Sequence, residues 1–253
     1  MSAIGAIGVF DSGIGGLSIL KCLREALPIE SFVYFADSAY NPYGDKSDAE
    51  VIARSFTVTE ELIAKHQIKA LVVACNTATA AAIHLLRARY PELAIVGIEP
   101  ALKPAAALTK TKHIAVLATR GTLASQKFLA LKASLDAQAE FACVPCIGLA
   151  NLIERYAADA ASKQEVEQAC KDFLAQAGAF DTLVLGCTHY ALIDPIFRTL
   201  VDTNITIVDN GEAVAKRLVA LVEATPRMVS EPILQLTGSG DQTLLQLAAK
   251  RWL

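Results

Sequence analysis

The sequence lacks the features that mark nucleic-acid-binding and disordered proteins. Its 23 lysines and arginines are outnumbered by 26 acidic residues, and no stretch of the chain is rich in basic residues. The chain therefore offers no basic surface to a phosphate backbone, and we expect no nucleic-acid partner. Charged residues make up 19% of the sequence and hydrophobic residues 53%, a balance that excludes intrinsic disorder. We expect a folded protein that binds small molecules.

Long uninterrupted apolar segments are also missing. The longest candidate, residues 70–86, is broken by polar side chains, among them Asn76 and His84. Its first part is rich in valine and its second in alanine and leucine, which is typical of a buried strand followed by a packed helix rather than a membrane span. The N-terminal MSAIGAIGVF has no positively charged region of the kind that begins a secretory signal. We therefore expect a cytoplasmic protein with no membrane partner.

The six cysteines form neither a disulfide framework nor a complete set of metal ligands. Without a secretory context they are expected to be reduced thiols. Cys143 and Cys146 form a CxxC pair, but no second pair of cysteines or histidines accompanies them at ligand spacing. We therefore interpret the pair as a coincidence at a strand end, and expect neither a metal nor a redox site there.

Short apolar runs that alternate with helical patterns are the main feature that is present. The first, residues 7–10, ends in the glycine-rich DSGIGG of residues 11–16, which matches neither GxGxxG nor a P-loop. This turn precedes a helical pattern, so its backbone N–H groups could bind a carboxylate or phosphate. Three further runs follow at residues 32–35, 71–73 and 95–98. The alternation predicts an α/β fold with a doubly wound, mostly parallel sheet.

The second half of the chain repeats this plan. Strand-like runs at residues 114–117, 141–144, 183–185 and 205–208 recur in the same order and at a nearly constant offset. Such a recurrence predicts two pseudo-symmetric α/β domains with the active site in the cleft between them. We assign residues 1–98 and 209–253 to the first domain and residues 99–208 to the second, with short, hinge-like connections between them.

Two cysteines follow equivalent strands of the two halves. Cys75 ends the run LVVAC and Cys187 ends LVLGC, and each precedes the start of a predicted helix, a position that lowers the pKa of a thiol. An isolated cysteine of this kind is usually a small buried hydrophobe. The paired positions instead favour a reaction with a proton donor and a proton acceptor on opposite sides, with His189 as a natural proton carrier. Asp11 either caps the following helix or lies in the cleft, and Glu154 is either a solvated helix residue or a partner of His189.

Six motifs in order make the sequence similar to the glutamate racemases of the aspartate/glutamate racemase superfamily. The resemblance covers nearly the whole chain, and the departures Ala191 and Asn210 lie beside the motifs. The motifs are FDSGIGGLS (residues 10–18), ADSAYNPYG (36–44), ACNTAT (74–79), GIEPA (97–101), ATRGT (118–122) and GCTHY (186–190).

This resemblance implies a cofactor-independent racemase that interconverts L- and D-glutamate and supplies D-glutamate for peptidoglycan synthesis. It implies that Cys75 deprotonates D-glutamate with help from Asp11. Cys187 would deprotonate L-glutamate with help from His189, which Glu154 would orient. No cofactor or metal is implied, the partner is the small substrate glutamate, and the family is usually homodimeric.

The resemblance also implies a set of residues that bind the substrate carboxylates and ammonium group, with Asp37 in a supporting role. These residues are Asp11, Ser12, Pro42, Tyr43, Gly44, Cys75, Asn76, Thr77, Thr119, Thr122, Cys187, Thr188 and His189.

Three alternatives stay open on the sequence. An aspartate racemase shares the two-cysteine plan, but its family pattern has an acidic residue where His189 stands. A cysteine hydrolase would use Cys75 or Cys187 as its nucleophile and His189 as its base, and would form an acyl-enzyme. A two-lobed binding module without catalysis is the third, although the paired cysteines favour an enzyme.

Overall fold

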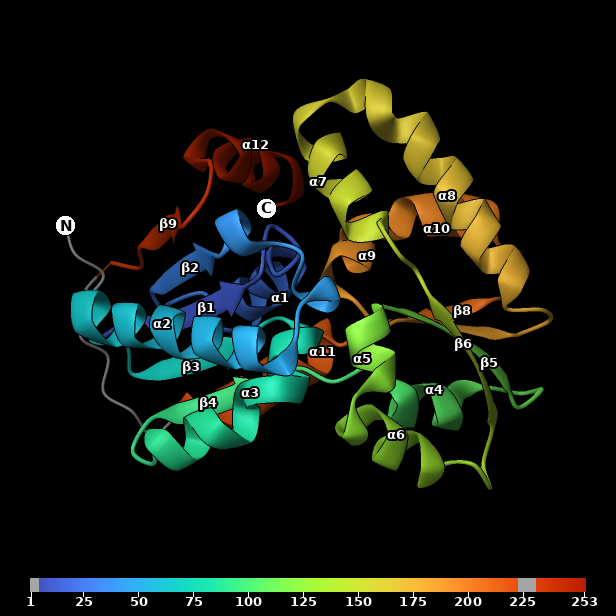
Figure 1. The fold of residues 1–253 in the computed structure, drawn as a ribbon, viewed down its shortest axis with the longest axis horizontal. Coiled ribbons are helices and arrows are strands. Elements are labelled where there is room, and N and C mark those ends of the chain that lie inside the picture. The colour runs from blue at the N-terminus through green and yellow to red at the C-terminus, as the bar shows by residue number, and fades with distance from the viewer. Residues whose placement is uncertain (1–4, 223–230) are drawn as a thin grey trace.

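The computed structural model describes residues 5–222 and 231–253, which form two parallel β-sheets flanked by helices (Figure 1). The first sheet has the strand order β4-β3-β1-β2-β9, and the second has the order β6-β5-β7-β8. Read from its other edge, the second sheet repeats β4-β3-β1-β2 of the first, so the predicted α/β class and internal repeat are confirmed. The strands are β1 (Ile7–Asp11), β2 (Phe32–Ala36), β3 (Ala70–Val73), β4 (Ala94–Gly97), β5 (His113–Ala118), β6 (Glu140–Pro145), β7 (Thr182–Leu185), β8 (Thr206–Val208) and β9 (Leu234–Gly238).

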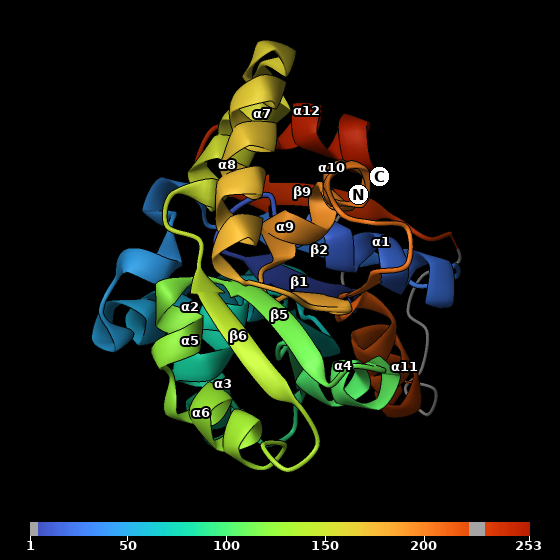
Figure 2. The same cartoon turned by 90° about the vertical axis from the view of Figure 1, so that its right-hand side faces the viewer.

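Helices connect the strands and cover both faces of each sheet. Figure 2 faces the second sheet and shows α7 and α8 on one side of it, with α4, α5 and α6 on the other. The helices are α1 (Leu17–Ala26), α2 (Asp48–His66), α3 (Asn76–Arg89), α4 (Leu102–Leu108), α5 (Arg120–Ala124), α6 (Gln126–Ala133), α7 (Leu149–Ala158), α8 (Lys163–Gln176), α9 (Thr188–Leu192), α10 (Asp194–Leu200), α11 (Gly211–Val222) and α12 (Gln242–Trp252).

The strands are buried because they carry apolar side chains on both faces of each sheet. On β1, Val9 packs into one hydrophobic cluster and Phe10 into another, as the alternation of side chains along a strand requires. The cluster that contains Val9 continues into the second sheet through Leu117 and Leu185. The two sheets therefore share one core, and the carboxyl ends of β1, β3, β5 and β7 are held in fixed relative positions.

The C-terminal part of the chain returns to the first sheet. Strand β9 pairs in parallel with β2, and α11 packs against α1 and β4. The described residues contain no helix long and apolar enough to cross a membrane. Helix α2 begins with a capping box: Ser47 accepts a hydrogen bond from the Glu50 N–H, and the Glu50 carboxylate accepts one from the Ser47 N–H.

Candidate active site

The carboxyl ends of the central strands bring the two predicted thiols to one cavity. Cys75 follows β3 and is the N-cap residue of α3, while Cys187 follows β7 and is the N-cap residue of α9. Both are buried, and both line a narrow hollow of about 20 Å³, which has room for about one water molecule. Its lining residues are Ser12, Asn41, Pro42, Tyr43, Gly44, Cys75, Asn76, Thr77, Thr119, Ala150, Cys187, Thr188 and His189.

Asp11, at the end of β1, lies behind the cavity and joins the two halves of the site. Its Oδ1 accepts hydrogen bonds from the Ser12 hydroxyl and the Gly13 N–H, both at 3.0 Å, and its Oδ2 accepts one from the Thr188 hydroxyl at 2.8 Å. The N-cap of α1 is Gly16, without a side-chain cap, so the capping alternative for Asp11 is wrong. Complete burial raises the pKa of Asp11 despite the nearby charge of His189.

The Cys75 thiol lies in the same network. Its Sγ accepts a hydrogen bond from the Ala78 N–H at 3.4 Å and lies 3.8 Å from the Ser12 hydroxyl oxygen. Burial, reinforced by the negative charge of Asp11, raises the pKa of Cys75 to about 12. The expectation of a lowered pKa at this helix start is therefore wrong for Cys75, because desolvation outweighs the helix N–H group.

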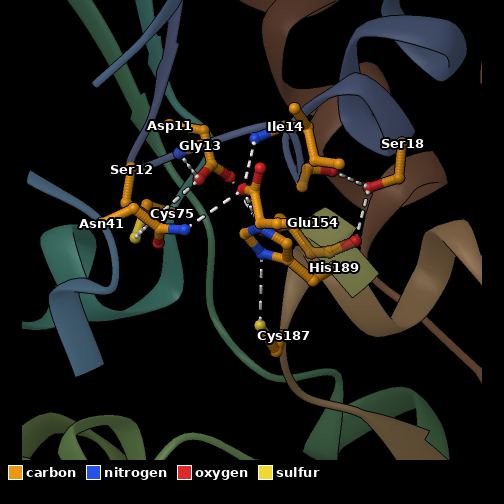
Figure 3. A network of polar contacts seen from close by, with 12 residues as sticks. Asp11, Ser12, Gly13, Ile14, Ser18, Asn41, Cys75, Glu154, Cys187 and His189 are labelled. Carbon is orange, nitrogen blue, oxygen red and sulfur yellow. Dashed lines mark hydrogen bonds and ion pairs between the residues drawn. The ribbon is translucent and has the colours of Figure 1, made fainter. Parts of the chain in front are cut away.

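Cys187 has a different partner. Its Sγ lies 3.9 Å from His189 Nδ1, and His189 Nε2 lies 2.8 Å from Glu154 Oε1 (Figure 3). Burial by itself lowers the pKa of His189. The contacts with Cys187 and Glu154 raise it by more than burial lowers it, so the net pKa lies well above the ordinary value. Glu154, on α7, is buried rather than solvated. Of the two roles that the sequence left open for it, the structure shows the second, a partner of His189.

Glycines let this pair approach the backbone of the first sheet. A methyl group at Gly15 would lie 2.6 Å from Thr188 Oγ1 and 2.8 Å from His189 Cε1, with His189 Nδ1 closer still. A methyl group at Gly13 would collide with Glu154 Oε1. The DSGIGG turn thus has a role that the sequence did not reveal: it receives the Glu154 and His189 side chains of the other half of the chain.

Hydroxyl and amide groups form the rest of the polar wall. The Thr119 hydroxyl donates to Thr122 Oγ1 at 2.9 Å and lies 3.1 Å from Thr77 Oγ1. Thr119 is also the N-cap of α5, where it accepts the Thr122 N–H. Among the described residues, neither polar atom of the Asn76 amide has a hydrogen-bond partner, although both are buried. Unpaired buried groups are costly, so this wall has free capacity for a polar ligand such as a carboxylate.

A short loop at residues 41–44 closes one side of the cavity. The Asn41–Pro42 peptide bond is cis, and Tyr43 is buried with its hydroxyl donating to Asp37 Oδ2 at 2.5 Å. Arg54 donates to both oxygens of Asp37, at 2.8 and 3.0 Å. Ser239, beyond β9, donates to Asp37 as well. Asp37 does not line the cavity, and its contacts anchor the loop.

Most of the predicted residues thus meet at one place. Asp11, Glu154 and Thr122 lie just behind the lining, and Asp37 supports the loop. Sequence reasoning missed Asn41 and Ala150 as lining residues. The proline after Asn41 in NPYG could have drawn attention to it, whereas Ala150 carries no chemical signal.

The CxxC pair lies outside the cavity. Cys143 and Cys146 are free thiols whose sulfur atoms lie near carbonyl oxygens of their own strand, at 3.7 and 3.5 Å. Across the part of the chain that the structure describes, no group of three or more histidine, cysteine or acidic side chains could hold a metal ion.

Known proteins share both this sequence and this fold. The chain is 46% identical to a glutamate racemase of Ectopseudomonas mendocina over 242 aligned residues, which make up 95% of this chain and 91% of the relative. The crystal structure of Escherichia coli glutamate racemase, in complex with L-glutamate and the activator UDP-MurNAc-Ala, matches with a TM-score of 0.89 at 28% identity, over 98% of this chain and 95% of that one. The Francisella tularensis glutamate racemase in complex with D-glutamate matches with a TM-score of 0.81 at 26% identity, over 98% and 93%.

A family profile agrees with these relatives. The profile described as Asp/Glu/Hydantoin racemase matches residues 7–218, most of the chain and every predicted site residue. The chain belongs to the aspartate/glutamate/hydantoin racemase family.

Proposed function

We propose that the protein is a glutamate racemase that interconverts L- and D-glutamate by proton transfer at Cα without a cofactor. The observation that carries this proposal is the pair of buried thiols, Cys75 and Cys187, that line one small cavity from equivalent strand ends. Extensive similarity to glutamate racemases supports glutamate as the substrate. The product, D-glutamate, is a building block of peptidoglycan, which is the role we assign to the enzyme.

The chemistry requires a base on one face of Cα and an acid on the other. From L-glutamate, the Cys187 thiolate takes the Cα proton and the electron pair moves into the α-carboxylate. The Cys75 thiol then delivers its proton to the opposite face, which leaves D-glutamate, a Cys187 thiol and a Cys75 thiolate. The reverse sequence converts D-glutamate. Because both thiols are held beside the same cavity, proton transfer between a thiol and Cα of the bound substrate becomes effectively unimolecular.

The two thiols have unlike proton partners. His189, protonated beside Glu154, stabilises the Cys187 thiolate through the 3.9 Å contact. On the other side, Ser12 lies between Cys75 and Asp11, at 3.8 and 3.0 Å, and offers a path for the Cys75 proton toward the carboxylate. The raised pKa of Asp11 suits it to accept that proton.

Fixed donors around the cavity stabilise charge that develops on the α-carboxylate. The free amide of Asn76 and the hydroxyl groups of the threonines supply such donors without the need to reorganise. The groups that we assign to substrate binding are Asp11, Ser12, Asn76, Thr77, Thr119, Thr122, Cys75, Cys187, Thr188 and His189, together with Pro42, Tyr43 and Gly44.

We also propose the division into domains and the setting in which they work. Residues 1–98 with 209–253 form the first domain and residues 99–208 the second; residues 1–4 and 223–230 of the former lie outside the described residues. The return of β9 and α11 to the first sheet supports this division. Six free cysteines suit the reducing cytoplasm, and we propose a homodimer, which light scattering of the purified protein would test.

The decisive experiment is proton NMR of L- or D-glutamate with the purified protein in D₂O, without added cofactor. The α-proton signal should disappear as solvent deuterium replaces it at each turnover. A signal that persists would falsify the racemase proposal. The variants Cys75→Ser and Cys187→Ser should each abolish racemisation, and a variant that still interconverts the isomers would show that the two-thiol mechanism is misassigned.

Two other activities make different predictions. A hydrolase that uses the Cys187–His189 pair would accumulate an acyl-enzyme, which mass spectrometry would detect and which racemisation does not form. An aspartate racemase would turn over aspartate in preference to glutamate in a circular-dichroism assay. The aspartate racemase of Picrophilus torridus is only 15% identical to this chain, a likeness that shows the shared fold alone.

A further inference from the structure

Glu154 holds the proton carrier of one thiol, yet most of what holds Glu154 belongs to the other half of the chain. Its Oε1 accepts three hydrogen bonds: from the Ile14 N–H at 3.0 Å, from Asn41 Nδ2 at 3.2 Å, and from His189 Nε2 at 2.8 Å (Figure 3). Glu154 and His189 lie on α7 and α9, whereas Ile14 and Asn41 lie on loops that follow β1 and β2.

The orientation of the Asn41 amide follows from its partner. An ionised carboxylate only accepts hydrogen bonds, so the amide nitrogen must face Glu154 and the amide oxygen must point away. That oxygen is buried and has no partner within the described part of the chain. Asn41 therefore gains one hydrogen bond to a charged group and leaves its other polar atom unpaired. An unpaired buried amide oxygen costs folding free energy, so the presence of Asn41 here is better explained by its effect on Glu154 than by a contribution to the stability of the fold.

Asn41 is also held firmly enough to act on Glu154. Tyr43, two residues further along the loop, ties it to the buried Asp37. Arg54 in turn fixes Asp37 through two hydrogen bonds. The amide therefore projects from a braced loop into the cavity wall, which it lines together with the thiols.

We propose that Asn41 is a positioning residue for the Cys187 side of the reaction: it holds the Glu154 carboxylate against His189 across the junction of the two halves. This inference rests on the proposed racemisation. Because this donor comes from the loop that closes the cavity, the position of the loop is coupled to the alignment of the proton carrier of Cys187. Asp11 has its own donors and no bond to Asn41, so removal of the Asn41 amide leaves the hydrogen bonds of Asp11 on the Cys75 side in place.

The test needs a readout that separates the two thiols. L- and D-glutamate are equally stable, so kcat/KM must be the same in both directions for any variant. Primary isotope effects do separate the two steps. With α-deuterated L-glutamate the deuteron is transferred to Cys187, and with α-deuterated D-glutamate it is transferred to Cys75.

In Asn41→Ala we expect kcat/KM to fall about tenfold, as the loss of one hydrogen bond to a charged group implies. The primary isotope effect from α-deuterated L-glutamate should rise, because proton transfer at Cys187 becomes slower. The effect from α-deuterated D-glutamate should fall toward unity for the same reason. Isotope effects that stay unchanged, move together, or change in the opposite sense would overturn the proposal.

Two further variants complete the experiment. Asn41→Asp keeps the shape but places a second carboxylate against Glu154, so the acid limb of the kcat/KM profile should move to higher pH. An unmoved limb would also contradict the proposal, even if Asn41→Ala failed to fold.

Asn210→Ala is the matched control, because the Asn210 amide donates to the Glu99 carbonyl away from the thiols, and its isotope effects should equal those of the unmodified enzyme. If the unmodified enzyme does not racemise glutamate, the proposed function fails; if it does and Asn41→Ala behaves normally, only this inference fails.

Discussion

Substitution of Gly15 by alanine tests whether the glycine-rich turn positions the chemistry. The backbone at Gly15 is not in the left-handed region, so alanine fits the local conformation. Its methyl group, however, would lie 2.6 Å from Thr188 Oγ1 and 2.8 Å from His189 Cε1, where ordinary contact begins at 3.4 Å. Both side chains are almost completely buried, and His189 Nδ1 lies closer still, so the turn and α9 must part by at least about 0.8 Å.

A displacement of this size acts on the reacting groups directly. A shift of about 1 Å in a catalytic group costs about a hundredfold in rate, so kcat/KM of Gly15→Ala should fall by about that factor. Relief of the overlap should also cost about 1–3 kcal/mol of unfolding free energy. Circular dichroism measures glutamate racemisation in both directions, and thermal unfolding measures stability. Activity within threefold of the unmodified enzyme would refute the reasoning.

Gly178→Ala provides the matched control. Gly178 follows α8 with a φ of +70°, and nothing lies within 4 Å of a methyl group placed there. Alanine in this left-handed conformation costs about 1–2 kcal/mol, similar to the cost at Gly15. We expect comparable losses of stability in the two variants but loss of activity only at Gly15. Equal losses of activity would mean that the effect at Gly15 reflects general destabilisation.

Three other predictions follow from the buried charges and thiols. Arg54→Ala should lower the free energy of unfolding by about 2–3 kcal/mol, because the buried Asp37 loses its cation while Tyr43 and Ser239 still donate to it. Urea unfolding measures this loss, and a value below about 0.5 kcal/mol would contradict the prediction. Iodoacetamide at neutral pH should modify Cys187 before Cys75, because His189 stabilises the Cys187 thiolate while burial raises the pKa of Cys75 to about 12. Peptide mass spectrometry measures the order of modification, and the reverse order would contradict the assignment. The raised pKa of Cys75 also predicts a pH dependence of stability. Its contribution is fully present below about pH 9 and is lost as the pH rises toward 12, because the unfolded thiol ionises first. The unfolding free energy should therefore fall about 2 kcal/mol less in Cys75→Ala than in the unmodified protein between pH 8 and 10.5, and parallel profiles would argue against it.

The two cysteines show how far the sequence carries. Their places at the ends of equivalent strands follow from the apolar runs that precede them, since such runs form buried parallel strands whose carboxyl ends meet at one edge. Their environments do not follow in the same way. The sequence predicts a lowered pKa at both helix starts, but in the structure burial and the charge of Asp11 raise the pKa of Cys75.

Local periodicity and backbone geometry thus determined the strands, the helices, the repeat and the capping box at Ser47, because these depend on residues close together in the chain. The tertiary structure alone decided the long-range partnerships. Thr188 donates to Asp11 from 177 residues away, and the Ile14 N–H donates to Glu154 from 140 residues away. Such contacts depend on how the two sheets pack against each other through their shared core. That packing places Gly15 under His189 and Asn41 against Glu154, and no local pattern encodes it.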